Sequence, residues 1–357
     1  MRAAVYTRYG PPDVIHITEV ETPAPKDNEV LIKVHAASVN PLDGALMKAR
    51  PHSLRILLGL RKPKDTRPGR DVAGEVRAVG RNVTRFKPGE EVFGLCLRDP
   101  QDSGAGVWAH CHGAFAEYTC APEATLVPKP DRVTFEQAAA VPVAALTALQ
   151  GLRDQGQIQP GHKVLIHGAG GGVGTFAVQI AKWLSADVTG VTGTGNLDMV
   201  RSIGADRVID YTQEDFTQSG QSYDLIFDCF ANHSLSACRR VLNPKGIYVM
   251  AGGPGSRWMI GILAPVIKAL VLSPFVSQKL VTFLARPNTE DLTTVHELMK
   301  TGKVTPVIDR CYRLNEVAEA IRHLEGGQAR GKVVITLENN HQVQNKPSRD
   351  SARLRFS

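Results

Sequence analysis

A run of glycines lies in the middle of the chain, between a short apolar segment and a helical pattern. Val164, Leu165 and Ile166 form a continuous apolar run, as expected of a parallel strand that is buried on both faces. Five glycines follow within the seven residues 168–174, and apolar residues then recur at helical spacing. Because a helix N-terminus presents unpaired N–H groups and glycine lets the backbone approach an anion, the pattern predicts a phosphate-binding turn. A glycine-rich turn without a ligand is the alternative.

The same stretch matches a dinucleotide fingerprint. Gly172, Gly174 and Ala177 satisfy the pattern G-x-G-x-x-G/A in its alanine form, and the strand and helix that the fingerprint requires are present on both sides. We therefore expect a dinucleotide to bind at this turn, with its pyrophosphate on the helix N-terminus.

The loop after the next strand indicates which dinucleotide. In this fold an Asp or Glu near the end of the second strand binds the ribose hydroxyls of NAD. Here the strand predicted over 187–191 is followed by Thr192-Gly-Thr-Gly-Asn196, and no acid stands at its end. Hydroxyl and glycine residues leave room and donors for a 2′-phosphate, which a carboxylate would repel, so the loop favours NADPH over NADH. A loop without nucleotide preference is the alternative.

Tyr211 ends the third predicted strand and reaches toward the same region. Its hydroxyl could donate to the 2′-phosphate, or it could be an ordinary half-buried tyrosine.

Composition narrows the class of protein. The chain has 357 residues, enough for two domains, and its 22% charged and 43% hydrophobic residues argue against wholesale disorder. Its net charge of +7 includes Arg349, Arg353 and Arg355, in a polar tail that begins near Asn339. We interpret the charge as a solvated tail plus an anionic cofactor site, and we expect no nucleic-acid partner.

The cysteines and the N-terminus indicate a cytoplasmic location. The six cysteines contain no C-x-x-C pair, which is typical of reduced thiols. Met1–Tyr6 already has the pattern of a strand, so we expect no signal or transit peptide.

An apolar stretch from Trp258 to Ala285 raises the question of a membrane span. Prolines and lysines at 265, 268, 274 and 279 interrupt it, so we expect no transmembrane helix. Buried helices and a wall of the substrate pocket are one interpretation of the stretch, and peripheral contact with a membrane is another.

The element pattern divides the chain into two kinds of structure. Residues 1 to about 125 have short strands separated by turn signals, which predicts a partly closed β-barrel, and the basic segment 42–68 interrupts them with a small helix and a loop. From about Pro128 helices and strands alternate, which predicts a doubly wound parallel sheet. The predicted strands are 3–6, 14–17, 29–36, 72–79, 91–94, 163–167, 187–191, 207–210, 223–228, 246–251, 305–308 and 332–337; the predicted helices are 135–151, capped by Thr134, then 175–184, 197–203, 234–242, 289–299 and 314–323.

Several further motifs follow one another along the chain. Besides the glycine turn, they are Val39-Asn-Pro-Leu-Asp43, Pro68-Gly-Arg-Asp-Val-Ala-Gly-Glu-Val76, Gly113-Ala-Phe-Ala-Glu-Tyr118, Gly204-Ala-Asp-Arg-Val-Ile-Asp-Tyr211 and Ala329-Arg-Gly-Lys-Val-Val-Ile335. In this order they resemble the zinc-independent quinone oxidoreductase branch of the medium-chain dehydrogenases/reductases. The nearest subgroup is the reticulon-4-interacting-protein-like quinone reductases, and the likeness covers residues 1 to about 337.

The resemblance implies a domain organisation and a set of cofactor-binding residues. It implies a GroES-like catalytic domain made of residues 1–125 and completed by residues 286–337. An NADP(H)-binding Rossmann domain would span residues 126–285, and a basic tail without fixed structure would span residues 338–357. The resemblance also implies a homodimer. The implied contacts are Thr147, Gly170, Gly171, Gly172 and Val173 at the nicotinamide side and the pyrophosphate, Gly193, Thr194, Asn196 and Tyr211 around the 2′-phosphate, and Phe230, Ala251, Gly252, Phe283, Ala329 and Arg330 near the nicotinamide.

The sequence argues against a zinc site. Zinc-dependent relatives carry a Cys where Asn40 stands and a Gly-His-Glu where this chain has Gly69-Arg70-Asp71, and arginine is not a zinc ligand. A structural zinc lobe needs four cysteines, and only Cys96 and Cys111 lie in that region. In the trio His110-Cys111-His112 adjacent residues of a strand would point to opposite faces, which favours a surface or core role. We also find no serine or cysteine nucleophile with a recognisable base.

Without a metal, the protein must hold the nicotinamide against an electron-poor acceptor and exclude water. Charge that develops on the acceptor oxygen needs a donor. Asn40 is the first candidate, and the ribose hydroxyl of the nicotinamide is another. Alternatively, the Asn40 side chain caps the turn before Pro41. We expect Asp43 and Arg70 to form a structural ion pair. We expect the final proton of the reaction to come from solvent.

Three classes of function remain open: an NADPH-dependent reductase of quinones or α,β-unsaturated carbonyls, a zinc-type alcohol dehydrogenase, and an NADPH-binding protein whose main role is association with a membrane or RNA.

Overall fold

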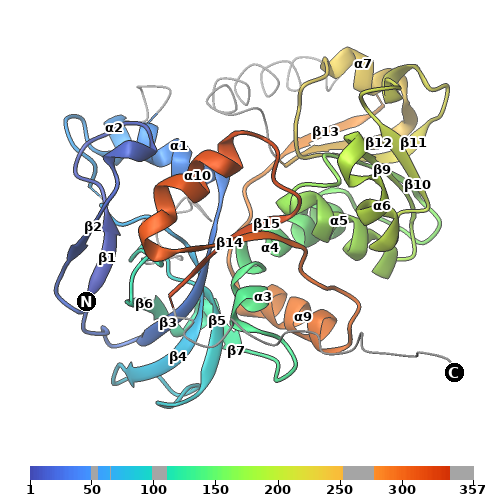
Figure 1. The fold of residues 1–357 in the computed structure, drawn as a ribbon. Helices are drawn as coiled ribbons and strands as arrows, with labels where there is room; N and C mark the ends of the chain where they lie inside the picture. The colour runs from blue at the N-terminus through green and yellow to red at the C-terminus, as the bar shows by residue number, and fades with distance from the viewer. Residues whose placement is uncertain (50–54, 65, 99–110, 252–276, 338–357) are drawn as a thin grey trace, which may run out of the picture.

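The computed structural model describes residues 1–49, 55–64, 66–98, 111–251 and 277–337. Figure 1 shows two lobes, with β15 and α4 between them. The predicted tail 338–357 and most of the apolar stretch 258–285 lie outside the described residues.

One lobe is built on a seven-stranded sheet. Its order is β14-β15-β3-β4-β5-β7, and β6 pairs with the other end of β3. The alternation of Val30, Ile32 and Val34 in β3 buries one face of the sheet, as the sequence pattern requires. The strands are β3 (Glu29–Val39), β4 (Asp71–Val79), β5 (Glu91–Leu95), β6 (Tyr118–Pro122), β7 (Leu126–Pro128), β14 (Ile308–Arg313) and β15 (Lys332–Thr336), and β1 (Arg2–Val5) pairs with β2 (His16–Glu19) beside them.

The other lobe is a six-stranded parallel sheet in the order β10-β9-β8-β11-β12-β13. The chain starts in the middle at β8, winds outward through β9 and β10, and then returns to the other side at β11. The crevice between the ends of β8 and β11 is therefore the topological switch point, where ligands bind in such sheets. The strands are β8 (Lys163–His167), β9 (Asp187–Thr192), β10 (Arg207–Asp210), β11 (Tyr223–Asp228), β12 (Leu242–Met250) and β13 (Lys279–Thr282). The predicted α/β fold class is confirmed.

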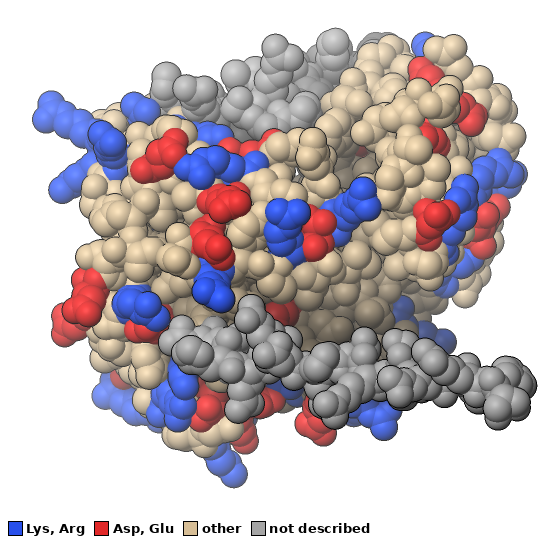
Figure 2. All heavy atoms as spheres, viewed as in Figure 1, with Lys and Arg blue, Asp and Glu red and all other residues tan. Residues whose placement is uncertain are grey.

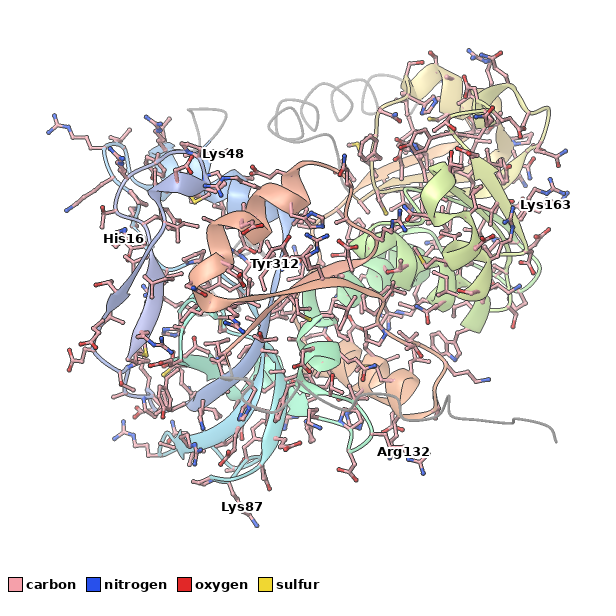
Figure 3. The ribbon with its side chains drawn as sticks, viewed as in Figure 1. His16, Lys48, Lys87, Arg132, Lys163 and Tyr312 are labelled. Atoms are coloured by element: carbon pink, nitrogen blue, oxygen red, sulfur yellow. The ribbon has the colours of Figure 1, made fainter. Side chains whose placement is uncertain are left out.

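The helices cover both sheets. Around the barrel lie α1 (Pro41–Lys48), α2 (Arg55–Leu58), α3 (Phe135–Ala139), α9 (Thr289–Lys300) and α10 (Val317–Glu325), and around the parallel sheet lie α5 (Gly172–Trp183), α6 (Leu197–Ser202) and α7 (Leu235–Arg240). Between the two lobes lies α4 (Pro142–Gln150), against β5 and α5. Figure 3 shows Lys48 on α1 beside α10, where it pairs with Glu325 at 2.6 Å.

Two predicted elements differ from the structure. The single helix 135–151 is two helices, because Pro142 cannot donate a backbone hydrogen bond, and its N-cap Thr134 is confirmed by a hydrogen bond from the Gln137 N–H. The strand predicted over 305–308 starts only at Ile308, because the side-chain amide of Gln179 takes both backbone groups of Thr305.

A few strands were displaced or missed. Pro11 and Pro12 set a 3-10 turn where the second strand was predicted to begin, so β2 starts at His16. Strand β13 lies at the end of the apolar stretch, in which the sequence indicated no strand. Strand β7 begins at Leu126, just past the domain boundary that we predicted at 125, and pairs with β5 in the barrel.

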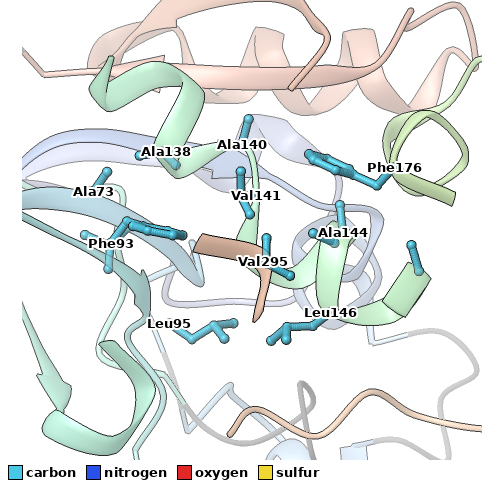
Figure 4. Packing of buried hydrophobic residues seen from close by; sticks show 14 of the residues in the cluster. Ala73, Phe93, Leu95, Ala138, Ala140, Val141, Ala144, Leu146, Phe176 and Val295 are labelled. Carbon is cyan, nitrogen blue, oxygen red and sulfur yellow. The ribbon is translucent and has the colours of Figure 1, made fainter. Parts of the chain in front are cut away.

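One apolar core extends through both lobes. Figure 4 shows Phe93 and Leu95 of β5 on one side of Val141, with Ala144, Leu146 and Phe176 on the other. Alanines of α3 and α4 fill the space between them, since small side chains let the helix backbones approach closely.

Charged side chains of both signs are mixed on the face of the molecule seen in Figure 2. Among the described helices, none is long and apolar enough to cross a membrane.

Candidate active site

The predicted phosphate turn connects β8 to α5 at the switch point. Gly168 has φ +83°, and a Cβ on Gly174 would lie 2.0 Å from the carbonyl oxygen of Gly168, so the turn requires glycine at both positions. Helix α5 begins at Gly172, and the N–H groups of its first turn therefore point toward the crevice. The geometry is that of an anion site.

The loop after β9 lies directly against this turn. The N–H groups of Gly168 and Ala169 both donate to the Val191 carbonyl oxygen at 3.0 Å. A Cβ on Gly170 would come within 2.7 Å of Thr192 Oγ1 and Asn196 Nδ2. The structure thus brings together the two stretches that we assigned to the pyrophosphate and the adenosine end.

Several glycines of these loops lie where a Cβ would collide with neighbouring protein atoms, so the loops pack this closely only because they are glycines. One observation fits a bound nucleotide. The buried Oδ1 of Asn196 has no hydrogen-bond partner, and a hydroxyl or amino group of a nucleotide would supply one.

At the adenosine end, the ring of Tyr211 packs on Gly193. A Cβ on Gly193 would lie 3.1 Å from the Tyr211 hydroxyl oxygen, and Tyr211 itself is 60% exposed. The guanidinium of Arg330 lies against Gly195, where a Cβ would be 2.9 Å from Nη2. Arg330, which the resemblance implied near the nicotinamide, therefore lies at the loop assigned to the 2′-phosphate.

Sequence reasoning missed an acid at this end. The end of β9 carries no carboxylate, but the neighbouring strand brings Asp210 beside it, and Thr194 Oγ1 donates to Asp210 Oδ2 at 2.6 Å. Hydrogen bonds from Thr194 and Thr212 hold the pKa of Asp210 below its usual value. Only the parallel pairing of β9 with β10, which no local pattern reveals, places the two together.

The residue that precedes β15 is hydrogen-bonded to the phosphate turn. The Gly331 N–H donates to the Gly170 carbonyl oxygen at 2.9 Å, and Gly331 has φ +91°. The next residue, Lys332, lays its aliphatic stem against Gly172, where a Cβ would be 3.0 Å from Cδ.

A buried polar cluster lies where the stem of Lys332 ends. Asp71, at the start of β4, is fully buried, and its Oδ2 accepts hydrogen bonds from Ser38 Oγ at 2.6 Å and Asn40 Nδ2 at 2.9 Å. Its Oδ1 accepts from the Val143 N–H in the first turn of α4 at 3.0 Å. The Asp71 carboxylate thus accepts hydrogen bonds from the barrel and from the first turn of α4.

Lys332 completes the cluster. Its Nζ donates to Asn40 Oδ1 at 2.7 Å and lies 3.4 Å from Asp71 Oδ2 and from the Val39 carbonyl oxygen. Burial lowers the pKa of Lys332, while Asp71 and Asp43 oppose the shift.

Asn40 therefore does not use its side chain to cap its own turn. Its backbone N–H donates to Asp43 Oδ2 at 2.8 Å, and its side-chain amide goes to Asp71 and Lys332 instead. The role of substrate donor stays a prediction.

The predicted Asp43–Arg70 ion pair is confirmed, with Arg70 Nη1 3.1 Å from Asp43 Oδ1 and both side chains buried. Burial raises the pKa of Asp43, against the effect of Arg70.

The other predicted contacts come from the ends of the strands beyond β11 and from α4. Phe230 follows β11 and is 49% exposed, Ala251 follows β12, and Phe283 follows β13 and reaches Gly151 at the end of α4. Thr147 on α4 donates its hydroxyl to the Val143 carbonyl oxygen at 2.7 Å. Gly252 lies outside the described residues.

Sequence reasoning also missed a second buried cluster, at the switch point. Asp228 ends β11 fully buried, where His167 Nδ1 lies 2.8 Å from Oδ1 and the Tyr248 hydroxyl donates to Oδ2 at 2.7 Å. The N–H groups of Phe230 and Ala231 also donate to Oδ1. The available signal was that two buried strands, β8 and β11, both end in a titratable residue.

The residues at the position of a zinc site do not form a metal-binding set. Arg70 is a cation held by Asp43, and Asn40 is held by Asp71 and Lys332. Within the described ranges, no three His, Cys, Asp or Glu side chains gather in a way that could hold a metal. Cys111 and His112 have separate partners, the Arg67 carbonyl oxygen and Glu29, and His110 falls outside those ranges.

Comparison with known proteins agrees with this architecture. The profile of the alcohol dehydrogenase GroES-like domain matches residues 26–131, and that of a zinc-binding dehydrogenase matches residues 203–335. The chain is 34% identical to a chloroplast envelope quinone oxidoreductase homolog of Arabidopsis thaliana, over 94% of this chain and 98% of that one. It is 32% identical to an NADPH-dependent alkenal/one oxidoreductase of the same plant, over 94% and 79%. The solved quinone oxidoreductase of Coxiella burnetii aligns with a TM-score of 0.80 and 29% identity, over 95% of this chain and 99% of that one.

Proposed function

Because this chain belongs to the quinone oxidoreductase-like branch of the medium-chain dehydrogenase/reductase superfamily, we propose that it transfers a hydride from NADPH to a quinone or an α,β-unsaturated carbonyl without zinc. One observation carries the proposal: the strand that bears Lys332 touches the phosphate turn and at the same time holds the amide of Asn40. A donor for the acceptor oxygen and a binding turn for the cofactor are thus parts of one rigid unit.

The bound cofactor would supply the hydride, and the chain would supply binding, orientation and a dry site. The N-terminus of α5 would hold the pyrophosphate, and Asn40 would donate its more weakly bound Nδ2–H to the oxygen that gains charge. Phe230 and Phe283 would cover the nicotinamide and exclude water.

A preference for NADPH is supported by charge. Arg330 lies over the loop 193–196, and the end of β9 carries no carboxylate. Asp210 opposes the preference, but the hydroxyls of Thr194 and Thr212 already bind its oxygens. One of the relatives at 32% identity is named as NADPH-dependent.

The proposal is tested by a screen of NADPH oxidation with quinones, alkenals and enoyl thioesters as acceptors. We expect turnover with at least one quinone or enone, with reduced acceptor formed in equal amount to the NADPH consumed and with slower oxidation of NADH. Chelator treatment is expected to leave the rate unchanged. Absence of turnover with every acceptor would overturn the assignment, and a chelator-sensitive rate would overturn its zinc-free form.

The subgroup, the oligomeric state and the location are also proposed. We propose that the chain belongs to the reticulon-4-interacting-protein-like subgroup, and that assignment would fail if a phylogenetic tree placed the chain on another branch. We propose a homodimer in the cytoplasm, with the domain boundaries predicted above except that the barrel extends through β7 to Pro128. Light scattering tests the dimer, for which a monomer mass is the contrary result, and cell fractionation tests the location.

A further inference from the structure

Lys332 is a buried cation that the proposed reaction does not use. Its side chain is 4% exposed, yet it sits among polar groups that fully engage its ammonium: Asn40 Oδ1, Asp71 Oδ2 and the Val39 carbonyl oxygen. A buried ammonium is costly unless it is paired, and here Asp71 pairs it. The shortest of its contacts, however, is the one with Asn40 Oδ1, and the role of Lys332 is sought there.

The chemistry of these partners decides how Asn40 is oriented. An asparagine side chain has nearly the same shape when its amide is flipped, so only its hydrogen bonds fix the positions of oxygen and nitrogen. An ammonium only donates, and it therefore requires the amide oxygen. An ionised carboxylate only accepts, and it therefore requires the NH2 group. Lys332 and Asp71 together permit one orientation of the amide.

We propose that Lys332 is a positioning residue that fixes the Asn40 amide so that its more weakly bound Nδ2–H can donate to the oxygen of the quinone or enone acceptor. The first Nδ2–H goes to Asp71 at 2.9 Å, and the second makes a long hydrogen bond of 3.5 Å with the Ser38 carbonyl oxygen, which the acceptor oxygen would replace. This inference rests on the proposed function, since it specifies how the donor of that site is set.

The same lysine balances the charge of the cluster. The groups that face it are Asp71 on β4 and Asp43 on α1, and Arg70 neutralises Asp43. Without Lys332, Asp71 keeps Ser38, Asn40 and the Val143 N–H as donors but loses its cation. Asp71 alone would still select the amide nitrogen, but no donor would then hold the amide oxygen, so the Asn40 side chain could turn and carry its second Nδ2–H away from the acceptor.

A double-mutant cycle tests whether Lys332 acts through Asn40. We expect Asn40→Ala to lower kcat by about a hundredfold, Lys332→Met by about tenfold or more, and the double variant by no more than Asn40→Ala alone. The matched control is Lys129→Met, because Lys129 is an equally buried barrel lysine paired with Glu91. It is expected to lower Tm but leave kcat unchanged. Losses that multiply in the double variant would overturn the proposal.

A second variant covers the case in which Lys332→Met does not fold. Lys332→Gln keeps a polar side chain of similar length, but its amide presents oxygen as readily as nitrogen and does not enforce the orientation. We expect a loss in kcat of about tenfold, with little change in KM for NADPH. A kcat within about twofold of the wild type would contradict the proposal.

A readout without turnover separates this inference from the function on which it rests. In a 1H–15N spectrum of asparagine-labelled protein, the Asn40 side-chain signal is identified by its loss in Asn40→Ala. It is expected to shift in the Lys332 variant and to stay in place in Lys129→Met. An unmoved signal overturns the role of Lys332, whereas a wild type that reduces no acceptor overturns the function and leaves this test valid.

Discussion

At the scale of the residue, we expect the preference between NADPH and NADH to depend on the balance between one cation and one carboxylate. Arg330 lies against Gly195, and Asp210 is hydrogen-bonded to Thr194 on the same loop. A 2′-phosphate would be attracted by the guanidinium of Arg330 and repelled by the carboxylate of Asp210. The hydroxyls around Asp210 spread its charge, so we expect Arg330 to decide the preference.

Replacing Arg330 with Met tests this balance. The variant keeps the length of the stem but removes the charge, so we expect the Kd for NADPH to rise by about tenfold and the Kd for NADH to change by less than about twofold. Fluorescence titration of the free protein measures both. The exposed Arg201→Met, whose partner is Asp198, is the control. Equal losses for both nucleotides would mean that Arg330 binds a part common to them.

Replacing Gly193 with Asp places a carboxylate at the end of β9, where NAD-dependent enzymes carry an acid. We expect KM for NADPH to rise by about tenfold or more and KM for NADH to rise less, because only NADPH carries the 2′-phosphate. The new Cβ would also press on Tyr211 at 3.1 Å, so Gly193→Ala measures that steric part by itself. If Asp and Ala weakened both nucleotides alike, the loop would not face the phosphate.

At the scale of the element, the phosphate turn and the buried cluster around Asn40 show how far the sequence could predict the site. The strand, the turn and the helix around Gly168–Gly174 follow from local periodicity, and β8, β10 and β11 were predicted with their observed bounds. The partners of Asn40 were not predicted, because Asp71 and Lys332 reach it from strands 31 and 292 residues away. Local patterns carry no information on such pairings.

Gly174 is the strictest position in the turn. A Cβ there would lie 2.0 Å from the Gly168 carbonyl oxygen, so Gly174→Ala must displace backbone atoms, at a cost of about 2 kcal/mol or more in the free energy of unfolding. We also expect nucleotide binding to be lost, because the N–H groups of α5 move. The control is Gly302→Ala, which has positive φ but no atom near its Cβ and should cost about 1 kcal/mol. Normal NADPH binding by Gly174→Ala would refute this geometry.

Asp228 joins β8 to β11 and β12, and it makes stability depend on pH. Burial by itself raises its pKa, but hydrogen bonds from His167, Ala231 and Tyr248 outweigh that and hold its pKa below the usual value. The unfolded chain therefore takes up its proton first as pH falls. The stabilisation is fully present above about pH 4 and is lost as pH falls further toward the folded-state pKa.

Asp228→Asn removes this contribution. We expect the variant to lose about 3 kcal/mol in the free energy of unfolding near neutral pH, because four donors lose their charged acceptor, and the difference should shrink below about pH 4. Urea unfolding at several pH values measures it. Asp198→Asn, with a fully exposed side chain, should have no effect. A constant difference across the pH range would show that charge is not the cause.

At the scale of the whole molecule, the two lobes share one interior. The cluster that contains Phe93 of the barrel also contains Phe176 of the parallel sheet, and α3 and α4 fill the space between them (Figure 4). The carboxylate of Asp71 adds a polar link, since it binds the barrel and the first turn of α4 together. Domains that share so much buried apolar surface are not expected to unfold separately.

Calorimetry tests whether the two lobes unfold together. We expect a single thermal transition for the wild type, with equal calorimetric and van't Hoff enthalpies. Phe176→Ala opens a cavity in the shared core and should cost about 3–5 kcal/mol. Because the core is common, the variant should melt earlier by both near-UV circular dichroism and tryptophan fluorescence, still in one step. Phe216→Ala, in the separate cluster on the parallel sheet, gives the comparison, because it removes the same side chain without touching the barrel. If Phe176→Ala split the transition in two, the interior would be two cores in contact, and the site would lie between independent domains.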